Sequence, residues 1–267
     1  MKISVSFILL SISASLSLNA VEIYDFNSTD SWESSSCLQK KTGYFTLTKS
    51  GTFLSSDFYP IDKNATCVVS MKVRKTPGSP AYLSHIGFYL YDASKIMLPS
   101  IWYRVENNSN SILTAAAKAE SKTVTILRPN YFPADILRRR WSIVFHATDN
   151  FSDLPNRTAN RVVRCKEVSE TEIELTLANS LQENYKAGTQ IRFHSSGPEM
   201  YSLINGKPLS DDWTEISAII KGEAAILSNR KWRKEAMFFK LLISNTPTTA
   251  DRNVKIDFKD VKIMVQP

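Results

Sequence analysis

The stretch HIGFYLY at residues 85–91 alternates large apolar side chains with other residues at every second position. Ile86, Phe88 and Leu90 would lie on one face of an extended strand, because successive side chains of a strand point to opposite faces. The same period of two recurs along the chain, in the segments 22–26, 43–48, 67–75, 122–127, 141–147, 172–177, 189–194, 214–220, 238–244 and 255–265. This pattern predicts an all-β protein.

Turn-forming residues separate these segments. The sequences PGSP at 77–80, NNSN at 107–110 and SSGP at 195–198 are typical of turns, and Asn205-Gly206 indicates a tight turn between two strands. Many short strands with few helices indicate a β-sandwich.

The part of the chain from about 107 to 160 is the least regular and the most polar. Within it, the stretches 113–121 and 133–140 could each form a short helix. No linker-like composition bounds this region. We therefore predict one β-sandwich domain over residues 21–267, with loop and short-helix insertions around 107–160, rather than two domains.

The N-terminus has the three parts of a secretory signal peptide. Lys2 gives a positive start, residues 3–18 are uncharged and mostly apolar, and Ala20 offers a small residue for cleavage. The apolar run is too short and too rich in serine to span a bilayer, and no later segment is long and apolar enough. The sequence predicts a signal peptide at 1–20 and a secreted, extracytoplasmic protein without a membrane span.

The composition fits a folded, basic protein. Apolar residues make up 43% of the chain, which is enough to fill a core, and the formal net charge is +7. In an exported protein this charge favours acidic polysaccharides, cell walls or anionic lipid headgroups as partners, and makes nucleic acid the weaker expectation. The alternative is that the charge serves solubility alone.

Three cysteines cannot form a disulfide framework. A Cys37–Cys67 pair is conceivable, since both residues lie in the N-terminal quarter, but three unpaired thiols are equally compatible with the sequence. No Cys/His spacing predicts a zinc site.

The two ends of the chain resemble a known family. DWTEISAIIKG at 212–222 is followed by MFFKLLIS at 237–244 and by VKIDFKDVKI at 254–263, while IYDF at 23–26 precedes Trp32. This order resembles the galactose-binding-like jelly rolls of the carbohydrate-binding module 4/9 type. The resemblance covers roughly 22–100 and 185–265 and leaves the middle unexplained. It implies a jelly-roll β-sandwich that binds carbohydrate.

Members of that family often hold a structural calcium ion near the first and last strands. The position of the first aspartate in their closing Asp-Asp pair is Lys259 here, followed by Asp260. A lysine supplies a positive charge where a cation needs oxygen ligands, so we expect no cofactor there. The acidic loop at 149–156 could bind calcium, but such a loop is more commonly an Asx-rich turn.

Sugar-binding proteins stack aromatic rings on sugars and fix the hydroxyl groups with polar side chains. The candidate aromatic residues are Tyr89, Tyr91, Trp102, Tyr103, Tyr185, Tyr201 and Trp232. Trp213 is left out because the tryptophan at this place in the resembling family is a packing residue. The segment 188–194 adds polar side chains on one strand face, and Trp232 stands between the basic residues of RKWRK at 230–234. The predicted ligand-binding residues are Trp102, Tyr103, Gln190, Arg192, His194, Tyr201 and Trp232; core packing or a solvated face is the alternative for each.

No catalytic motif is present: the chain lacks GxSxG, HExxH and a phosphate-binding loop. The signal peptide, the resemblance and the lack of a catalytic motif together predict a secreted, non-catalytic protein that binds polysaccharide, with acidic polysaccharide as one option, or a cell-surface glycan. Two alternatives stay open. One is a structural or adhesion protein that binds no glycan, and the other is a polysaccharide lyase or glycoside hydrolase.

Overall fold

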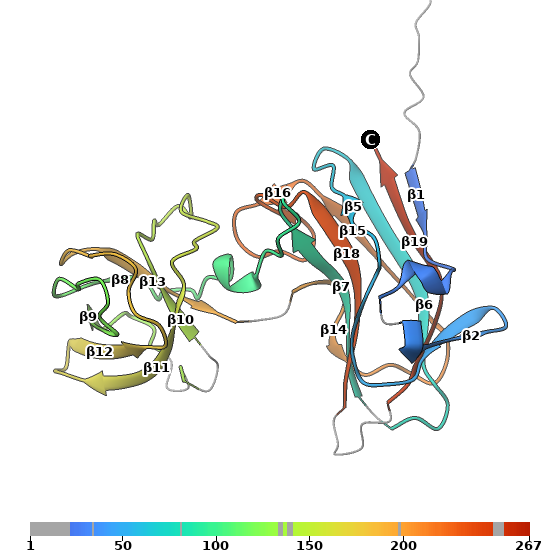
Figure 1. Ribbon diagram of the computed structural model, residues 1–267, viewed down its shortest axis with the longest axis horizontal. Coiled ribbons are helices and arrows are strands. Elements are labelled where there is room, and N and C mark those ends of the chain that lie inside the picture. The colour runs from blue at the N-terminus through green and yellow to red at the C-terminus, as the bar shows by residue number, and fades with distance from the viewer. Residues whose placement is uncertain are drawn as a thin grey trace, which may run out of the picture.

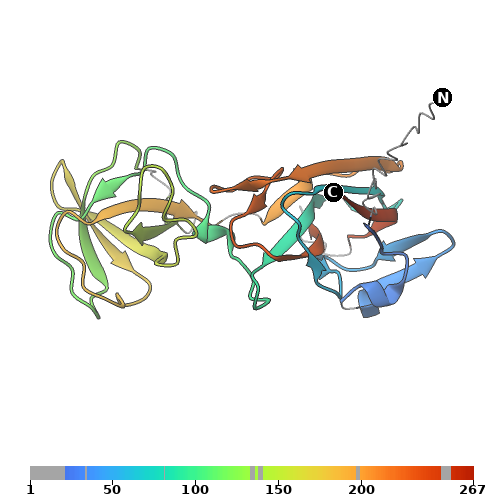
Figure 2. The same ribbon diagram turned by 90° about the horizontal axis from the view of Figure 1, so that it is seen from above.

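The computed structural model describes residues 22–33, 35–80, 82–132, 136–137, 141–196, 199–247 and 254–267. The expected signal peptide at 1–20 lies outside these residues. Figures 1 and 2 show two lobes: a larger one built from both ends of the described chain and a smaller one built from its middle. In the described part of the chain, no helix has the length and apolarity needed to cross a membrane.

The larger lobe contains two antiparallel sheets. One has the order β15-β6-β19-β3-β2 with β1 also beside β19, and the other has the order β14-β7-β18-β4 with β5 also beside β18. The strands of the first sheet are β1 (Glu22–Asp25), β2 (Leu38–Lys41), β3 (Tyr44–Leu47), β6 (Thr66–Lys75), β15 (Thr214–Lys221) and β19 (Ile256–Gln266). Those of the second are β4 (Gly51–Leu54), β5 (Tyr59–Pro60), β7 (Tyr82–Tyr91), β14 (Met200–Lys207) and β18 (Phe238–Pro247).

The strand order of the larger lobe is that of a jelly roll. The paths β3-β19-β6-β15 and β4-β18-β7-β14 each place strands from both halves of the chain side by side, as two interlocked Greek keys do. The structure thus confirms the predicted all-β sandwich. The smaller lobe is inserted between β7 and β14.

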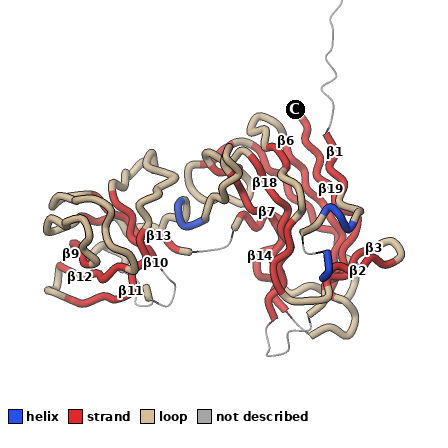
Figure 3. Tube along the Cα trace, in the orientation of Figure 1, coloured by secondary structure: helices blue, strands red, loops and turns tan. Residues whose placement is uncertain are grey.

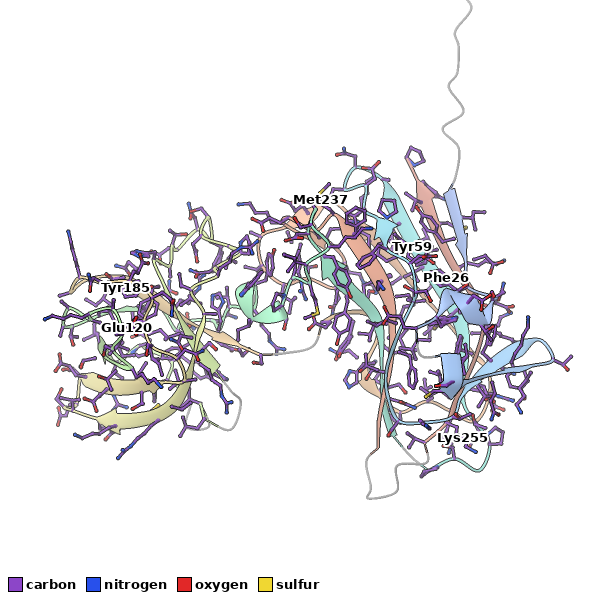
Figure 4. The ribbon with its side chains drawn as sticks, in the orientation of Figure 1. Phe26, Tyr59, Glu120, Tyr185, Met237 and Lys255 are labelled. Carbon is purple, nitrogen blue, oxygen red and sulfur yellow. The ribbon has the colours of Figure 1, made fainter. Side chains whose placement is uncertain are left out.

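Alternating side chains from both sheets fill the core of the jelly roll. Ile86, Phe88 and Leu90 of β7 are buried, as the alternation in HIGFYLY predicts. The neighbouring rings of Phe26 and Tyr59 lie between the sheets, with their centroids 5.1 Å apart (Figure 4). Burial of these side chains from both ends of the chain is the main stabilising contribution to the lobe.

The smaller lobe has one antiparallel sheet with the order β8-β13-β10-β11-β12-β9. Its strands are β8 (Ser111–Ile112), β9 (Thr123–Leu127), β10 (Trp141–Phe145), β11 (Asn160–Glu167), β12 (Glu172–Leu177) and β13 (Gln190–Ser195). The sheet closes on itself through a bridge between Leu113 and Ile126, beside which the Thr114 amide donates to the Thr125 carbonyl over 3.0 Å. The lobe has its own hydrophobic core around Trp141 and Phe193.

The region expected to be irregular, around 107–160, therefore lies within a strand-rich lobe that continues to residue 195. The expected helix at 113–121 is wrong. Leu113 and Ala117 instead form bridges with Ile126 and Tyr185, so tertiary pairing overrides the helix propensity of three consecutive alanines. The expected helix at 133–140 lies mostly outside the described residues. Helical structure in the described chain is limited to the short 3-10 turns η1 (Thr29–Ser31), η2 (Ser35–Cys37) and η3 (Ser100–Trp102) (Figure 3).

All three thiols are unpaired. Cys67 is buried in the jelly-roll core, and this burial raises its pKa to about 12. Cys37 packs against the same core and Cys165 against the core of the smaller lobe. The Cys37–Cys67 disulfide considered from the sequence is not formed.

Candidate functional site

Two of the predicted ligand-binding residues are core residues. Trp232 is 1% exposed, and its ring packs against Phe88 and Phe239 between the sheets. The Tyr103 ring is fully buried, and its hydroxyl donates to the Lys234 carbonyl over 2.7 Å. Neither ring has a surface on which a sugar could stack, so Trp232 offers no exposed ring between the basic residues of RKWRK.

Two further candidates belong to a buried polar network in the smaller lobe. Both Arg192 and His194 have no exposed area. The Arg192 guanidinium donates to both Asp153 carboxylate oxygens, over 2.8 and 3.4 Å, and to the Thr148 carbonyl over 3.0 Å. Its Nε donates to His194 Nε2 over 3.1 Å. This network fastens the loop at 148–156 to the sheet, and the Asp153 carboxylate of that loop is occupied by protein donors.

The remaining three candidates lie apart. Trp102 is half-buried at the junction of the lobes, where the Arg157 guanidinium lies 4.5 Å from its ring centroid. Gln190 is exposed at the start of β13 in the smaller lobe, whereas Tyr201 lies on β14 of the jelly roll. The seven residues therefore do not form one site. Tyr201, however, is part of a second cluster of aromatic residues.

That cluster lies on the outer side of the strands β14, β7 and β18. We call it the tyrosine face and define it by His85, Tyr89, Tyr91, Tyr201, Glu199 and Lys240. Because Ile86, Phe88 and Leu90 point into the core, the residues between them point outward. Pairing of β7 with β18 places Lys240 opposite Tyr89 and Phe238 opposite Tyr91. The alternation that builds the core thus also builds this face.

Gly87 lets β14 approach the middle of the tyrosine face. Met200 pairs with Phe88 and Ile204 with Ile86, so three residues of β14 face Gly87 alone. A Cβ atom at Gly87 would lie 2.0 Å from the Met200 carbonyl oxygen. The resulting bulge brings the Tyr201 ring onto the His85 ring, with centroids 4.6 Å apart.

Lys240 supplies a fixed positive charge beside the tyrosines. Its Nζ atom donates to the Ser56 carbonyl over 2.8 Å and pairs with the Glu33 carboxylate. The same Nζ lies 4.3 Å from the centroid of the Phe58 ring. Only 5% of Lys240 is exposed, and these contacts compensate its buried charge and hold the ammonium group in place.

The tyrosine hydroxyls of this face stay neutral to a higher pH than ordinary tyrosines do. Burial raises the pKa of Tyr91 and of Tyr201 to about 12 and also raises that of Tyr89. The charge of Glu33 adds to this effect at Tyr91, and that of Glu199 adds to it at all three tyrosines. Burial also raises the pKa of Glu199, and the cation of Arg233, 3.6 Å away, opposes this effect. At neutral pH each phenol can therefore both donate and accept a hydrogen bond.

Sequence reasoning found part of this face. Tyr89, Tyr91 and Tyr201 are all among the candidate aromatic residues of the sequence, but the set of predicted ligand-binding residues contains only Tyr201. The signal that could have selected the others is the alternation in HIGFYLY, which predicts their shared outward face. No local pattern marks Glu33 or Glu199, because each reaches the face from a connecting segment.

No metal site emerges in the residues that the structure describes, since no three His, Cys, Asp or Glu side chains gather there. The Lys259 ammonium lies 4.5 Å from the Trp213 ring centroid. Asp257 accepts hydrogen bonds from Thr46, Thr76 and Arg74, which occupy both of its oxygens.

The fold and the tyrosine face together define a class of protein. It is a two-lobed β-sandwich protein in which a jelly roll presents aromatic residues on one sheet. No protein-family model matches the chain, and no curated protein matches its sequence.

Proposed function

We propose that the protein is secreted and binds polysaccharide, without cleaving it, on the tyrosine face. The observation that carries this proposal is the grouping of Tyr89 and Tyr201, both partly exposed, with His85 on one sheet of a jelly roll. The resemblance of the two chain ends to carbohydrate-binding modules of type 4/9 supports it, as does the predicted signal peptide.

The chemistry of the face suits a sugar ring. The apolar side of a pyranose would stack on Tyr89 or Tyr201, while phenol hydroxyls and the Glu199 carboxyl group would bind sugar hydroxyls. Pairs of aromatic rings contribute about 0.5–1.5 kcal/mol beyond the area they bury, and we expect a ring stacked on a sugar to contribute on the same order. Several such contacts along one polymer would give measurable affinity without any reacting group.

Affinity electrophoresis through gels that contain neutral or acidic polysaccharides tests the proposal. We expect the wild type to be retarded by at least one polymer, and Tyr89→Ala or Tyr201→Ala to weaken that binding about tenfold. Tyr131→Ala, which removes an exposed aromatic ring from the smaller lobe, is the matched control and should bind normally. Unchanged migration in every gel would overturn the proposal and favour a structural or adhesion protein.

One observation favours a glycan-cleaving enzyme as the second candidate. Glu199, on the face, is partly buried and has a raised pKa, whereas Glu33, beside the face, is exposed and pairs with Lys240. Two carboxyl groups in different environments thus lie at this surface. Such pairs serve as general acid and base in glycosidases. New reducing ends, or unsaturated products that absorb ultraviolet light, would support this candidate if they disappear in Glu199→Gln. Retardation without products would support the binding protein.

A further inference from the structure

A recess lies in the other sheet of the jelly roll, where two strands share one edge of β19. Strand β3 pairs with Ile256–Phe258, and β1 pairs with 262–265. The intervening residues of β19 form a bulge in which Asp260 has a φ of 53°. The gap between β1 and β3 is a recess of about 340 Å³, lined among others by Lys40, Lys41, Gly43, Tyr44, Lys259 and Asp260.

The recess carries an excess of positive charge. Among the described residues, Lys40, Lys41 and Lys259 have no ion-pair partner, while Asp260 is paired with Lys72 over 3.3 Å. Three lysines thus line the recess, and its one carboxylate is already paired with a fourth lysine from β6. Lys40 and Lys41 are both exposed and border the recess from β2. Because they are consecutive strand residues, Lys41 projects on the side of its partner Tyr44 and Lys40 on the side of its partner Phe45.

An aromatic platform borders the recess. Trp213, expected as a packing residue, lies half-buried outside the core, with the Arg74 guanidinium 4.6 Å and the Lys259 ammonium 4.5 Å from its ring centroid. The Tyr44 ring meets the Trp213 ring edge-on at 5.7 Å. The Arg74 Nε atom pairs with the buried Asp257 carboxylate, 2.9 Å away, which fixes the position of the guanidinium group. Cations and ring edges are thus fixed at one place on the sheet.

We infer that this recess is a second binding site, which takes the sulfate or carboxylate groups of an anionic polysaccharide. The inference goes beyond the proposed function: it adds a second site on the other sheet and names the charge of the polymer that this site would bind. A recess of this size admits a group that projects from a polymer chain, whereas an anionic membrane would present a broad surface. The net charge of +7 would add long-range attraction to the same ligand.

The test compares two triple variants with the same loss of charge. Lys40→Gln, Lys41→Gln and Lys259→Gln together remove the free cations of the recess. Lys118→Gln, Lys122→Gln and Lys186→Gln remove three exposed lysines from the smaller lobe. Dextran sulfate, polygalacturonate and neutral dextran are the probes, at low and high salt, and circular dichroism verifies folding.

We expect the recess variant to bind dextran sulfate or polygalacturonate about tenfold more weakly at low salt and to lose most of the salt dependence, with neutral polymers unaffected. The two anionic polymers distinguish sulfate from carboxylate. An equal loss in both variants would overturn the inference, because charge alone would then explain binding. Tighter binding to phosphatidylglycerol vesicles than to either polymer, abolished in the recess variant, would overturn it in favour of a membrane.

The same measurements separate the two proposals. Binding of neutral polymers alone would refute the recess as a site and leave the tyrosine face standing. Binding of anionic polymers that Tyr89→Ala leaves intact, but the recess variant abolishes, would refute the tyrosine face and leave the recess standing.

Discussion

His194 is held neutral by the contacts of both ring nitrogens. Its Nε2 atom accepts the hydrogen bond from Arg192 Nε, so the proton resides on Nδ1, which donates to the Ile101 carbonyl over 2.7 Å. Burial lowers the pKa of His194 to about 4, and the charge of Arg192 acts in the same direction. A proton on Nε2 would face the Arg192 N–H group directly.

This geometry predicts a pH-dependent stability. The unfolded chain protonates His194 below about pH 6.5, whereas the folded chain keeps it neutral down to about pH 4. The free energy of unfolding should therefore fall as the pH drops from 6.5 to 4, by about 3 kcal/mol from this residue alone. Urea unfolding at several pH values measures the slope. His194→Gln should flatten it, and His146→Gln, at an exposed histidine, should not; equal slopes in all three proteins would contradict the assignment.

At the scale of single residues, the sequence did not predict that Arg192 and His194 are buried. Their alternation with Ile191 and Phe193 correctly predicted a strand, but it left open whether the polar face meets solvent. The partners that bury it are 39 positions from Arg192 and 93 positions from His194. No local pattern reveals contacts of that separation.

The pair β7–β14 shows how one element controls the candidate site. Alternation predicted β7 because both of its faces are regular, one in the core and one on the tyrosine face. The bulge of β14 was not predictable, since its cause is the missing side chain of Gly87 on another strand. Isolated glycines within a strand pattern point to such close approaches, but not to the partner.

Gly87→Ala should therefore disrupt the pairing of β7 with β14. The added methyl group would overlap backbone atoms of Met200 and Tyr201, which cannot rotate away as a side chain can. We expect a loss of about 3 kcal/mol in unfolding free energy, measured by urea denaturation, together with weaker polysaccharide binding. Gly78→Asn, at a turn glycine with a φ of 79° and open space around it, is the control and should change little. A fully stable Gly87→Ala protein would contradict the described bulge.

The whole molecule is a jelly roll with the smaller lobe inserted into it, and the two points where the chain enters and leaves the smaller lobe lie next to each other. The Ser195 amide donates to the Arg104 carbonyl over 3.1 Å, and Val105 bridges with His194. Each lobe has its own core. The resemblance noted in the sequence left roughly residues 101–184 unexplained, and most of this stretch belongs to the smaller lobe. Composition could not reveal a second core there, because the chain enters and leaves the lobe without a linker.

Joining Arg104 to Ser195 through two glycines should leave a folded jelly roll. A two-residue turn fits the ends because they are already paired. The deletion removes the junction contacts, including the Arg157–Glu235 ion pair at 2.7 Å, so we expect a lower melting temperature but one cooperative transition. Circular dichroism and calorimetry measure both. A deletion protein without a cooperative transition would show that the larger lobe depends on the smaller one for folding.

Strand β19 has a consequence for synthesis. It is the last strand in chain order, yet it lies inside its sheet, paired with β6 on one side and with β3 and β1 on the other. Until residues 256–266 have left the ribosome, β3 and β6 have no common neighbour and the sandwich cannot close. The smaller lobe, whose strands lie between 111 and 195, has no such constraint. The smaller lobe can thus fold completely before β19 is available to complete the jelly roll.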